Sequence, residues 1–348
     1  MSAIQDQLEA VVATGVPGVA VVALGPEGRA EAAAGFADLA TGELLTVEHR
    51  FRIGSVTKIF VASLVLQLVA DGLLDLDGEA APFVEGVTIR QLLNHTSGLD
   101  DFNVDMVLFF EPYRRDPAHR WELGPRDELQ LVLEKPRLFP PGKGWAYHGS
   151  NYIVLRLVVE AATGMGLRDA LHERVFGPLG LQQTDLVEGP LRGACAHGYL
   201  APDNPILPGG PGPVDVTELD LPFYRAGGGI VSTAGDVVTM LRAQLRGELL
   251  PADLRREMLD AVESDWEETD RYGLGIGEIT ALMDRRRSPC GSSWGHLGFS
   301  VGYTAVALSS EDGERQVVVC ANGHPTTVAA EEAFWDATGK LAWSLYCN

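Results

Sequence analysis

The chain has 348 residues, of which 46% are hydrophobic and 22% are charged. This is enough for one large domain or two medium ones, and the composition excludes a disordered, collagen-like or coiled-coil chain. The formal net charge is −21, with 27 Lys and Arg against 48 Asp and Glu. Nucleic-acid binding needs clustered basic residues, and the short basic run at 285–287 is typical of a solvated turn. We expect a small neutral or cationic substrate, with neither nucleic acid nor membrane as a partner.

The N-terminus lacks the basic and apolar regions of a signal peptide, and no stretch reaches the roughly 18 apolar residues of a membrane span. A cytoplasmic protein is expected, although a trimmed exported protein would show the same pattern. Cys195, Cys290, Cys320 and Cys347 form no CxxC pair, which favours free thiols over a disulfide framework or a zinc site. We expect no metal and no cofactor, and a monomer is the default.

In the first half of the chain, the apolar run 17–24 and the segment 30–35 predict two antiparallel strands. Residues 55–71 show helical spacing, and Gly72 ends the helix as a C-cap. Thr88 is a predicted N-cap of a short helix. A helical stretch is expected after Gly124-Pro125, and 150–163 is a strong amphipathic helix.

In the second half, residues 198–214 read as a loop, and the segment from Ser232 caps a helix that runs to about Leu245. Strands are predicted at 272–279, 304–309 and 316–321, with a hairpin turn at 310–314 and a closing helix over 329–346. This order predicts an α+β fold, in which residues 1–75 and 216–348 form an antiparallel sheet domain flanked by helices. Residues 76–215 form an inserted, mainly helical domain, and the active site is expected in the cleft between the two.

The most informative short motif is Ser55-Val56-Thr57-Lys58. At the start of a helix, residues three positions apart share one face, so the Ser55 and Lys58 side chains can meet. A serine hydroxyl becomes a strong nucleophile when a neighbour takes its proton, and a lysine with a lowered pKa can do so. The motif predicts a nucleophilic serine beside a proton acceptor.

Two further segments carry groups suited to the same chemistry. Tyr147 lies at a loop-to-helix junction, where a phenolate stabilised by cations can act as a general base. Gly298 in the segment 295–299 is a candidate substrate-binding residue, because a glycine allows the substrate to approach the backbone closely, and the Phe299 N–H can complete an oxyanion hole with that of Ser55. His296 is expected to point into the cleft as a hydrogen-bond donor or a cation.

Together these segments resemble the serine β-lactamase and penicillin-recognising family, in its branch of class C β-lactamases, DD-peptidases and esterases. Order and spacing match from about residue 17 to the C-terminus. The resemblance is carried by residues 51–58, 73–77, 88–99, 141–142, 178–181, 226–236 and 295–303.

The resemblance implies that Ser55 is the nucleophile and Lys58 its proton partner. Tyr147 matches the tyrosine of the family's Tyr-x-Asn motif, and residues 296–298 match its Lys-Thr-Gly motif, which often reads His-x-Gly in the peptidase and esterase branch. The implied cycle is attack by Ser55, a tetrahedral oxyanion held by the Ser55 and Phe299 amides, and release of the acyl group to water or another acceptor.

One position departs from the family pattern, because Tyr147-His148-Gly149 lacks the asparagine. In the family its carboxamide contacts the acylamide of the substrate and the lysine. Ser150 or Asn151 is a candidate replacement, and His148 is either a substrate contact or a solvent-facing side chain. The departure favours an intracellular esterase or biosynthetic transacylase on a small acyl substrate over cell-wall chemistry.

Several alternatives remain open. A D-alanyl-D-alanine carboxypeptidase, a D-aminopeptidase or a β-lactamase fits the same motifs, and a catalytically inactive sensor fits the fold. Both 291–295 and 298–302 match GxSxG, but a strand-like segment instead of a helix follows the second. A metal hydrolase built on His95, His148 and His296 lacks any HExxH spacing.

Overall fold

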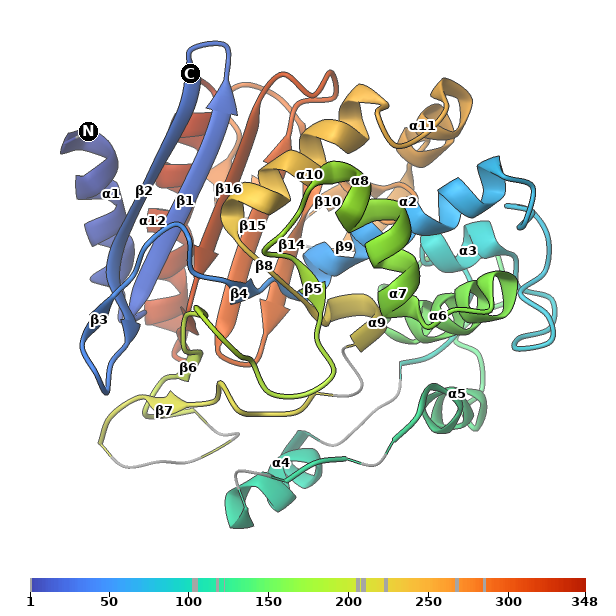
Figure 1. Cartoon of the computed structure of the whole chain (residues 1–348), viewed down its shortest axis with the longest axis horizontal. Helices are drawn as coiled ribbons and strands as arrows, with labels where there is room; N and C mark the ends of the chain where they lie inside the picture. The colour runs from blue at the N-terminus through green and yellow to red at the C-terminus, as the bar shows by residue number, and fades with distance from the viewer. Residues whose placement is uncertain are drawn as a thin grey trace.

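Both ends of the chain build one antiparallel sheet in the computed structural model, which describes residues 2–101, 106–116, 119–121, 123–204, 207, 211–221, 225–266, 269–283 and 286–348. Across these residues the sheet has the strand order β3-β2-β1-β16-β15-β14-β11-β10-β9. Strand β1 of the N-terminal part pairs with β16 of the C-terminal part, and the two termini lie at the same side of the molecule (Figure 1). The predicted α+β class is confirmed. The strand bounds are β1 Gly18–Gly25, β2 Gly28–Asp38, β3 Glu43–Leu44, β9 Val262–Trp266, β10 Thr269–Tyr272, β11 Gly277–Ile279, β14 Ser293–Ser300, β15 Tyr303–Ser309 and β16 Gln316–Ala321.

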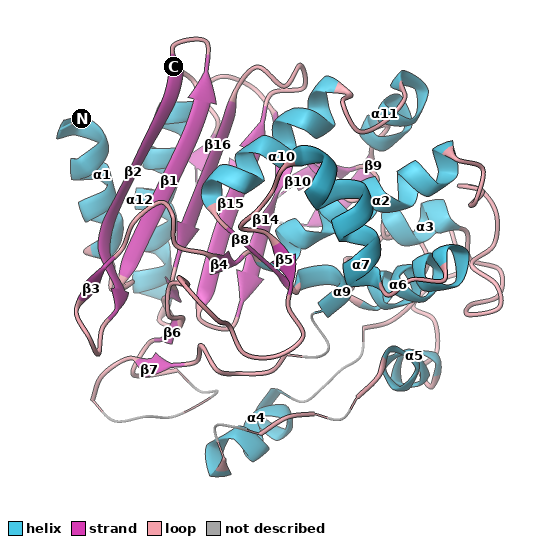
Figure 2. Ribbon diagram, in the orientation of Figure 1, coloured by secondary structure: helices cyan, strands magenta, loops and turns pink. Residues whose placement is uncertain are grey.

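Helices cover both faces of this sheet (Figure 2). On β1, Val19 and Val21 pack in the cluster that contains α12, whereas Ala20 and Val22 pack in the cluster that contains α10. A strand buried on both faces reads as a continuous apolar run, which explains the pattern at 17–24. The helices are α1 Ser2–Val12, α2 Thr57–Ala70, α3 Ile89–Leu93, α4 Met106–Arg115, α5 Pro125–Leu133, α6 Ser150–Thr163, α7 Leu167–Leu171, α8 Gly177–Leu179, α9 Arg225–Gly228, α10 Ala234–Arg246, α11 Ala252–Leu259 and α12 Val328–Tyr346, with short helical turns η1 Gly54–Val56 and η2 His172–Phe176.

Short strands complete the fold outside the main sheet. Strand β8 pairs with β4 on one side and β5 on the other, which ties the segment before Ser55 to the middle of the chain. The predicted loop 198–214 lies partly outside the described residues, and two short strands lie at its ends. The remaining bounds are β4 Phe51–Arg52, β5 Asp185–Leu186, β6 Tyr199–Leu200, β7 Val214–Asp215, β8 Ile230–Ser232, β12 Ala281–Leu282, β13 Arg286–Arg287 and β17 Gly323–His324.

The strand predicted at 272–279 is wrong as a single element. It divides into the end of β10 and the whole of β11, with a break at residues 273–276. Gly275 has φ +77°, and a Cβ atom there would lie 2.4 Å from the Cβ of Ala62 on α2. The chain turns here because the backbone must pass close to α2, which only glycine permits.

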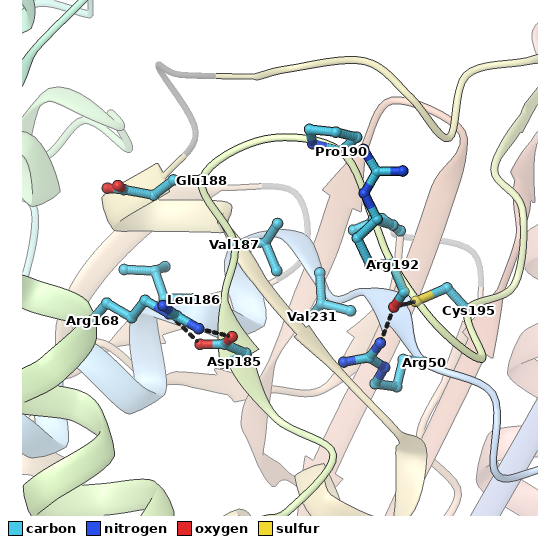
Figure 3. Close-up of a pocket in the computed structure, with 11 residues that line it drawn as sticks. Arg50, Arg168, Asp185, Leu186, Val187, Glu188, Pro190, Arg192, Cys195 and Val231 are labelled. Atoms are coloured by element: carbon cyan, nitrogen blue, oxygen red, sulfur yellow. Dashed lines mark hydrogen bonds and ion pairs between the residues drawn. The ribbon is translucent and has the colours of Figure 1, made fainter.

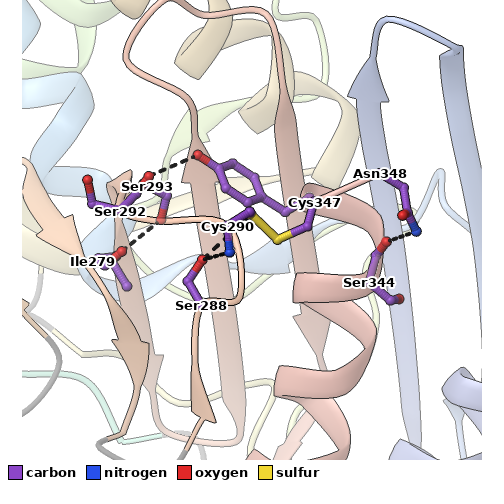
Figure 4. Close-up of a disulfide and its surroundings, with 9 residues drawn as sticks. Ile279, Ser288, Cys290, Ser292, Ser293, Ser344, Cys347 and Asn348 are labelled. Atoms are coloured by element: carbon purple, nitrogen blue, oxygen red, sulfur yellow. Dashed lines mark hydrogen bonds between the residues drawn. A yellow bond between two sulfur atoms is a disulfide. The ribbon is translucent and has the colours of Figure 1, made fainter.

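A disulfide joins Cys290, in the turn before β14, to Cys347, just after α12 (Figure 4). The expectation of free thiols is therefore wrong for this pair and holds for Cys195 and Cys320, which are free and buried. The two bonded residues are 57 positions apart in sequence, and their Cα atoms lie 5.7 Å apart. Only the packing of α12 against the sheet brings the two cysteines together, so their spacing in the sequence does not predict the disulfide.

Within the part of the chain that the structure describes, no helix combines the length and apolarity that a membrane span requires. The domain boundaries at 75 and 216, the cytoplasmic location and the monomeric state stay predictions.

Candidate active site

Ser55 and Lys58 meet at the start of α2, as the SxxK spacing predicts. Ser55 lies in η1 and is partly exposed, whereas Lys58 lies in the first turn of α2 and is 3% exposed. The Lys58 Nζ lies 3.0 Å from the Ser55 Oγ and donates a hydrogen bond of 2.8 Å to the carbonyl oxygen of Gly227. The amine is thus held against the hydroxyl from which a proton must be removed.

Burial changes the acidity of this lysine. Loss of hydration lowers the pKa of Lys58 from 10.5 to about 7, and the negative charge of Asp101 limits the decrease. At neutral pH a substantial share of Lys58 is therefore the neutral amine, which is the form that accepts a proton. The site holds a hydroxyl beside a base whose pKa is close to 7.

The backbone of β14 lies against η1 on the other side of Ser55. Ser300 and Tyr303 flank a two-residue turn, and such residues form a hydrogen-bonded pair. Because hydrogen-bonded and non-hydrogen-bonded pairs alternate along an antiparallel ladder, the next pair, Phe299 and Thr304, is not hydrogen-bonded through its backbone. The Phe299 N–H therefore points away from β15. Pairing with β11 covers residues 293–295 of β14 and ends before this position. The Phe299 N–H lies at a strand edge next to η1, where it can bind an oxyanion.

Two glycines permit this close approach. A Cβ atom on Gly54 would lie 2.5 Å from the Phe299 N, and a Cβ atom on Gly298 would lie 2.0 Å from the carbonyl oxygen of Ile53. Contacts this short do not occur, so a side chain at either position would push β14 away from η1. The structure places Gly298 as a spacer between backbones at the site.

His296 has a different character from the one expected. Its ring is completely buried, and Nδ1 contacts the carbonyl oxygen of Leu297, so Nδ1 carries the proton and Nε2 is an acceptor. Burial, followed by the charge of Lys58, lowers the pKa of His296 to about 3. The ring is neutral across the physiological range and accepts a hydrogen bond from the hydroxyl of Tyr272, 3.0 Å away. The Nε2 atom of His296 is therefore an acceptor, whereas a donor or a cation was expected at this position.

Tyr147 lies between Lys58 and His296. Its ring centre is 4.8 Å from the Lys58 Nζ, and its hydroxyl oxygen is 3.4 Å from the His296 Nε2. His95, buried and with φ +63°, packs against the Tyr147 ring with their centres 4.5 Å apart. The structure therefore brings together Ser55, Lys58, Tyr147 and His296, the residues that the motifs predict.

The two further candidate contacts, His148 and Asn151, have other partners. Asn151 is completely buried, and its carboxamide accepts from Ser97 at 2.6 Å and donates to the Nδ1 of His95 at 2.9 Å. This placement does not support a substrate contact for Asn151. The Nδ1 of His148 lies 3.8 Å from a carboxylate oxygen of Asp101.

The rival motifs fall outside this arrangement. Ser300 ends β14 and is followed by strand β15 instead of a helix, and Ser293 is buried with its hydroxyl bonded to the carbonyl of Ile279. Among the described residues, no three His, Cys, Asp or Glu side chains are grouped as ligands for a metal ion. Neither serine has the context of a nucleophile elbow.

A separate cavity of about 500 Å³ lies beside β5 and β8 (Figure 3). Arg168 and Asp185 form an ion pair in its wall, and the Arg50 guanidinium bonds to the carbonyl of Arg192 near the buried Cys195. None of the residues predicted for catalysis lines it.

Comparisons with known proteins agree with this geometry. The model of the Beta-lactamase family matches residues 3–339. The chain belongs to the Beta-lactamase family.

It is 30% identical to penicillin-binding protein 4 of Amycolatopsis lactamdurans, over 94% of this chain and 86% of that protein. It is 31% identical to esterase EstB of Burkholderia gladioli, over 77% of this chain and 76% of that protein. The structure of D-amino acid amidase from Ochrobactrum anthropi SV3 in complex with L-phenylalanine amide superposes with a TM-score of 0.84, at 26% identity, over 98% of this chain and 97% of that one. These relatives identify this Beta-lactamase-family protein as a serine hydrolase.

Sequence reasoning missed Asp101 and Tyr272. Asp101 lies two residues after the segment 88–99 that carries the resemblance, but an aspartate in a predicted loop gives no sign that it lies close to Lys58. Tyr272 was placed in a strand, and only the pairing of β10, β11 and β14 brings its hydroxyl to His296.

Proposed function

We propose that the protein hydrolyses small carboxylic esters or amides through a covalent acyl-enzyme on Ser55. The observation that supports this most strongly is the 3.0 Å contact between the Ser55 Oγ and a Lys58 amine whose pKa is about 7. A lysine that is half neutral near pH 7 can take the serine proton without the help of a histidine.

In the first half of the cycle, the Lys58 Nζ removes the Ser55 proton as the Oγ–carbon bond forms. The carbonyl π electrons move onto the oxygen, which the Ser55 and Phe299 N–H groups stabilise. When the tetrahedral intermediate collapses, the bond to the leaving group breaks and the leaving alkoxide or amine receives the proton through Tyr147. In the second half, Lys58 removes a proton from water as the water attacks the ester on Ser55. The bond to the Ser55 Oγ then breaks, Lys58 returns the proton to that oxygen, and the carboxylic acid leaves.

Water is the proposed acceptor. A transacylase, in which an alcohol or amine attacks the same acyl-enzyme, is the alternative. The absence of an asparagine at Gly149 argues against peptide and β-lactam side chains, because no carboxamide is present at that position to bind an acylamide. We therefore place esters and simple amides ahead of D-alanyl-D-alanine peptides and β-lactams.

The test is hydrolysis by the wild type, Ser55→Ala and Ser300→Ala. The substrates are p-nitrophenyl acetate and butyrate, with nitrocefin and a D-alanyl-D-alanine peptide in parallel. We expect ester turnover in the wild type and in Ser300→Ala, and a loss of at least about 1,000-fold in Ser55→Ala, since removal of a nucleophile leaves only the binding and oxyanion contributions. Full activity of Ser55→Ala would contradict the proposal, and efficient peptide cleavage by the wild type would assign the protein to cell-wall chemistry instead.

A further inference from the structure

We infer that Asp101 binds a free ammonium group of the substrate beside the scissile acyl carbon, so that the preferred substrates are amino acid esters or amides with an unblocked amine. The inference rests on the proposed function, since it concerns the substrate class of the Ser55 site. It assigns a specificity-determining role to a residue that no sequence motif indicated.

Asp101 lies close to Gly149, the position of the missing asparagine. Its Oδ1 accepts hydrogen bonds from the Ser150 N–H at 3.3 Å and the Ser150 hydroxyl at 3.1 Å. Ser150 directly follows Gly149, the position that matches the asparagine of the family's Tyr-x-Asn motif. The Asp101 side chain is 40% exposed, so it keeps solvent-accessible surface beside this position. An anion thus lies next to the place where the family pattern has a neutral amide.

The charge of Asp101 is maintained. Burial opposes its ionisation, but hydrogen bonds from His148 and Ser150 and the charge of His148 lower its pKa below the ordinary 3.8. Its carboxylate is also close enough to Lys58 to favour the charged form of that amine. A substrate ammonium placed here would be attracted by a permanent negative charge in a site that is partly shielded from water.

Within the described part of the chain, the ion-pair contact of the Asp101 carboxylate is with a histidine and not with a lysine or an arginine. His148 lies 3.8 Å from the carboxylate, and Lys58 is a second titratable group close enough to feel its charge. The Lys135 ammonium bonds instead to the backbone carbonyl of Asp101 and lies 4.0 Å from the carboxylate of Asp100. With a net charge of −21, the whole molecule also attracts cationic in preference to anionic ligands. The structure that superposes with a TM-score of 0.84 is that of a protein named D-amino acid amidase.

A purely structural role is the alternative, because Asp101 accepts the Ser150 N–H at the start of α6. The substitution Asp101→Asn separates the two roles. An asparagine oxygen accepts the same hydrogen bonds, so the cap is retained, whereas the negative charge is lost. Asp100→Asn is the matched control, since it removes the same charge one residue away, where the carboxylate faces Lys135.

The experiment measures inhibition of p-nitrophenyl acetate hydrolysis at pH 7 by phenylalaninamide and by N-acetylphenylalaninamide, with both enantiomers of each. Both compounds are measured on the same enzyme, so effects that act equally on the two compounds cancel in the ratio of their inhibition constants. We expect the wild type and Asp100→Asn to bind the free amine more tightly than the acetylated compound. Asp101→Asn should reduce that preference at least about 10-fold, which is the scale of a lost hydrogen bond to a charged group.

The outcomes are distinguishable. If the wild type does not hydrolyse p-nitrophenyl acetate, the proposed function itself fails. If hydrolysis is present but the two compounds inhibit equally, or the preference is unchanged in Asp101→Asn, the ammonium site is overturned and the hydrolase proposal stands.

Discussion

At the scale of single residues, the site depends on how burial and one carboxylate set the acidity of Lys58. Desolvation lowers its pKa to about 7, and Asp101 acts in the opposite direction. The neutral amine is the base, so the reactive fraction grows as the pH rises through this value and declines below it.

This electrostatic balance predicts a pH dependence. For p-nitrophenyl acetate, kcat/KM should rise with pH, with a midpoint near 7, the pKa of Lys58. Asp101→Asn should move the midpoint to lower pH, because the carboxylate no longer stabilises the charged amine, while Asp100→Asn should leave it nearly in place. The midpoint is obtained from hydrolysis rates measured in a stopped assay between about pH 5 and about pH 9, roughly two pH units on either side of the pKa. A midpoint that rises in Asp101→Asn would contradict the assigned electrostatics.

The sequence identifies residues better than it identifies their chemical state. Ser55 and Lys58 follow from helical spacing, and Tyr147 and His296 follow from the family resemblance. The protonation of His296 depends on its complete burial, on the Leu297 carbonyl and on the distance to Lys58. None of these is visible in a linear pattern, so the sequence predicts a donor or a cation where the ring is neutral and its Nε2 is an acceptor.

At the scale of elements, the site requires β14 to lie directly against η1. Gly298 meets the backbone of Ile53, so Gly298→Ala should force the strand away from the Ser55 turn and displace the Phe299 N–H. We expect ester turnover to fall at least about 100-fold, since a shift near 1 Å in catalytic geometry costs this much.

The matched control for this change is Gly166→Ala, where an added Cβ meets nothing within 4 Å. It should retain wild-type turnover. Circular dichroism and thermal melts on both variants check that the chain still folds. Wild-type kinetics in a folded Gly298→Ala variant would show that the contact between β14 and η1 is not needed for catalysis.

Elements that depend on local patterns were predicted well, and those that depend on tertiary contacts were not. The bounds of α6 and β16 match the predicted ranges, and Thr88 is the N-cap expected of α3. The segment 272–279 has the composition of one strand, but the chain breaks into two strands where Gly275 lies close to α2. Local propensity is a weak guide where a second element fixes the backbone.

At the scale of the whole molecule, the order of strands and helices was sufficient to predict a sheet built from both termini. It was not sufficient to predict the Cys290–Cys347 disulfide, because that bond needs the final position of α12 against the turn before β14. Contacts between residues far apart in the chain require the assembled fold. The same reason hides the proximity of Asp101 to Lys58.

The most direct test of the account is the site of covalent modification. The wild type, Ser55→Ala and Ser300→Ala are treated with a fluorophosphonate, and intact-mass and peptide mass spectrometry locate the adduct. We predict a single adduct on Ser55 in the wild type and in Ser300→Ala, and none in Ser55→Ala, because the Ser55 hydroxyl is in contact with the Lys58 amine, whose pKa is about 7. An adduct on Ser300 or on another serine, or labelling that survives in Ser55→Ala, would contradict the central claim that Ser55 is the nucleophile.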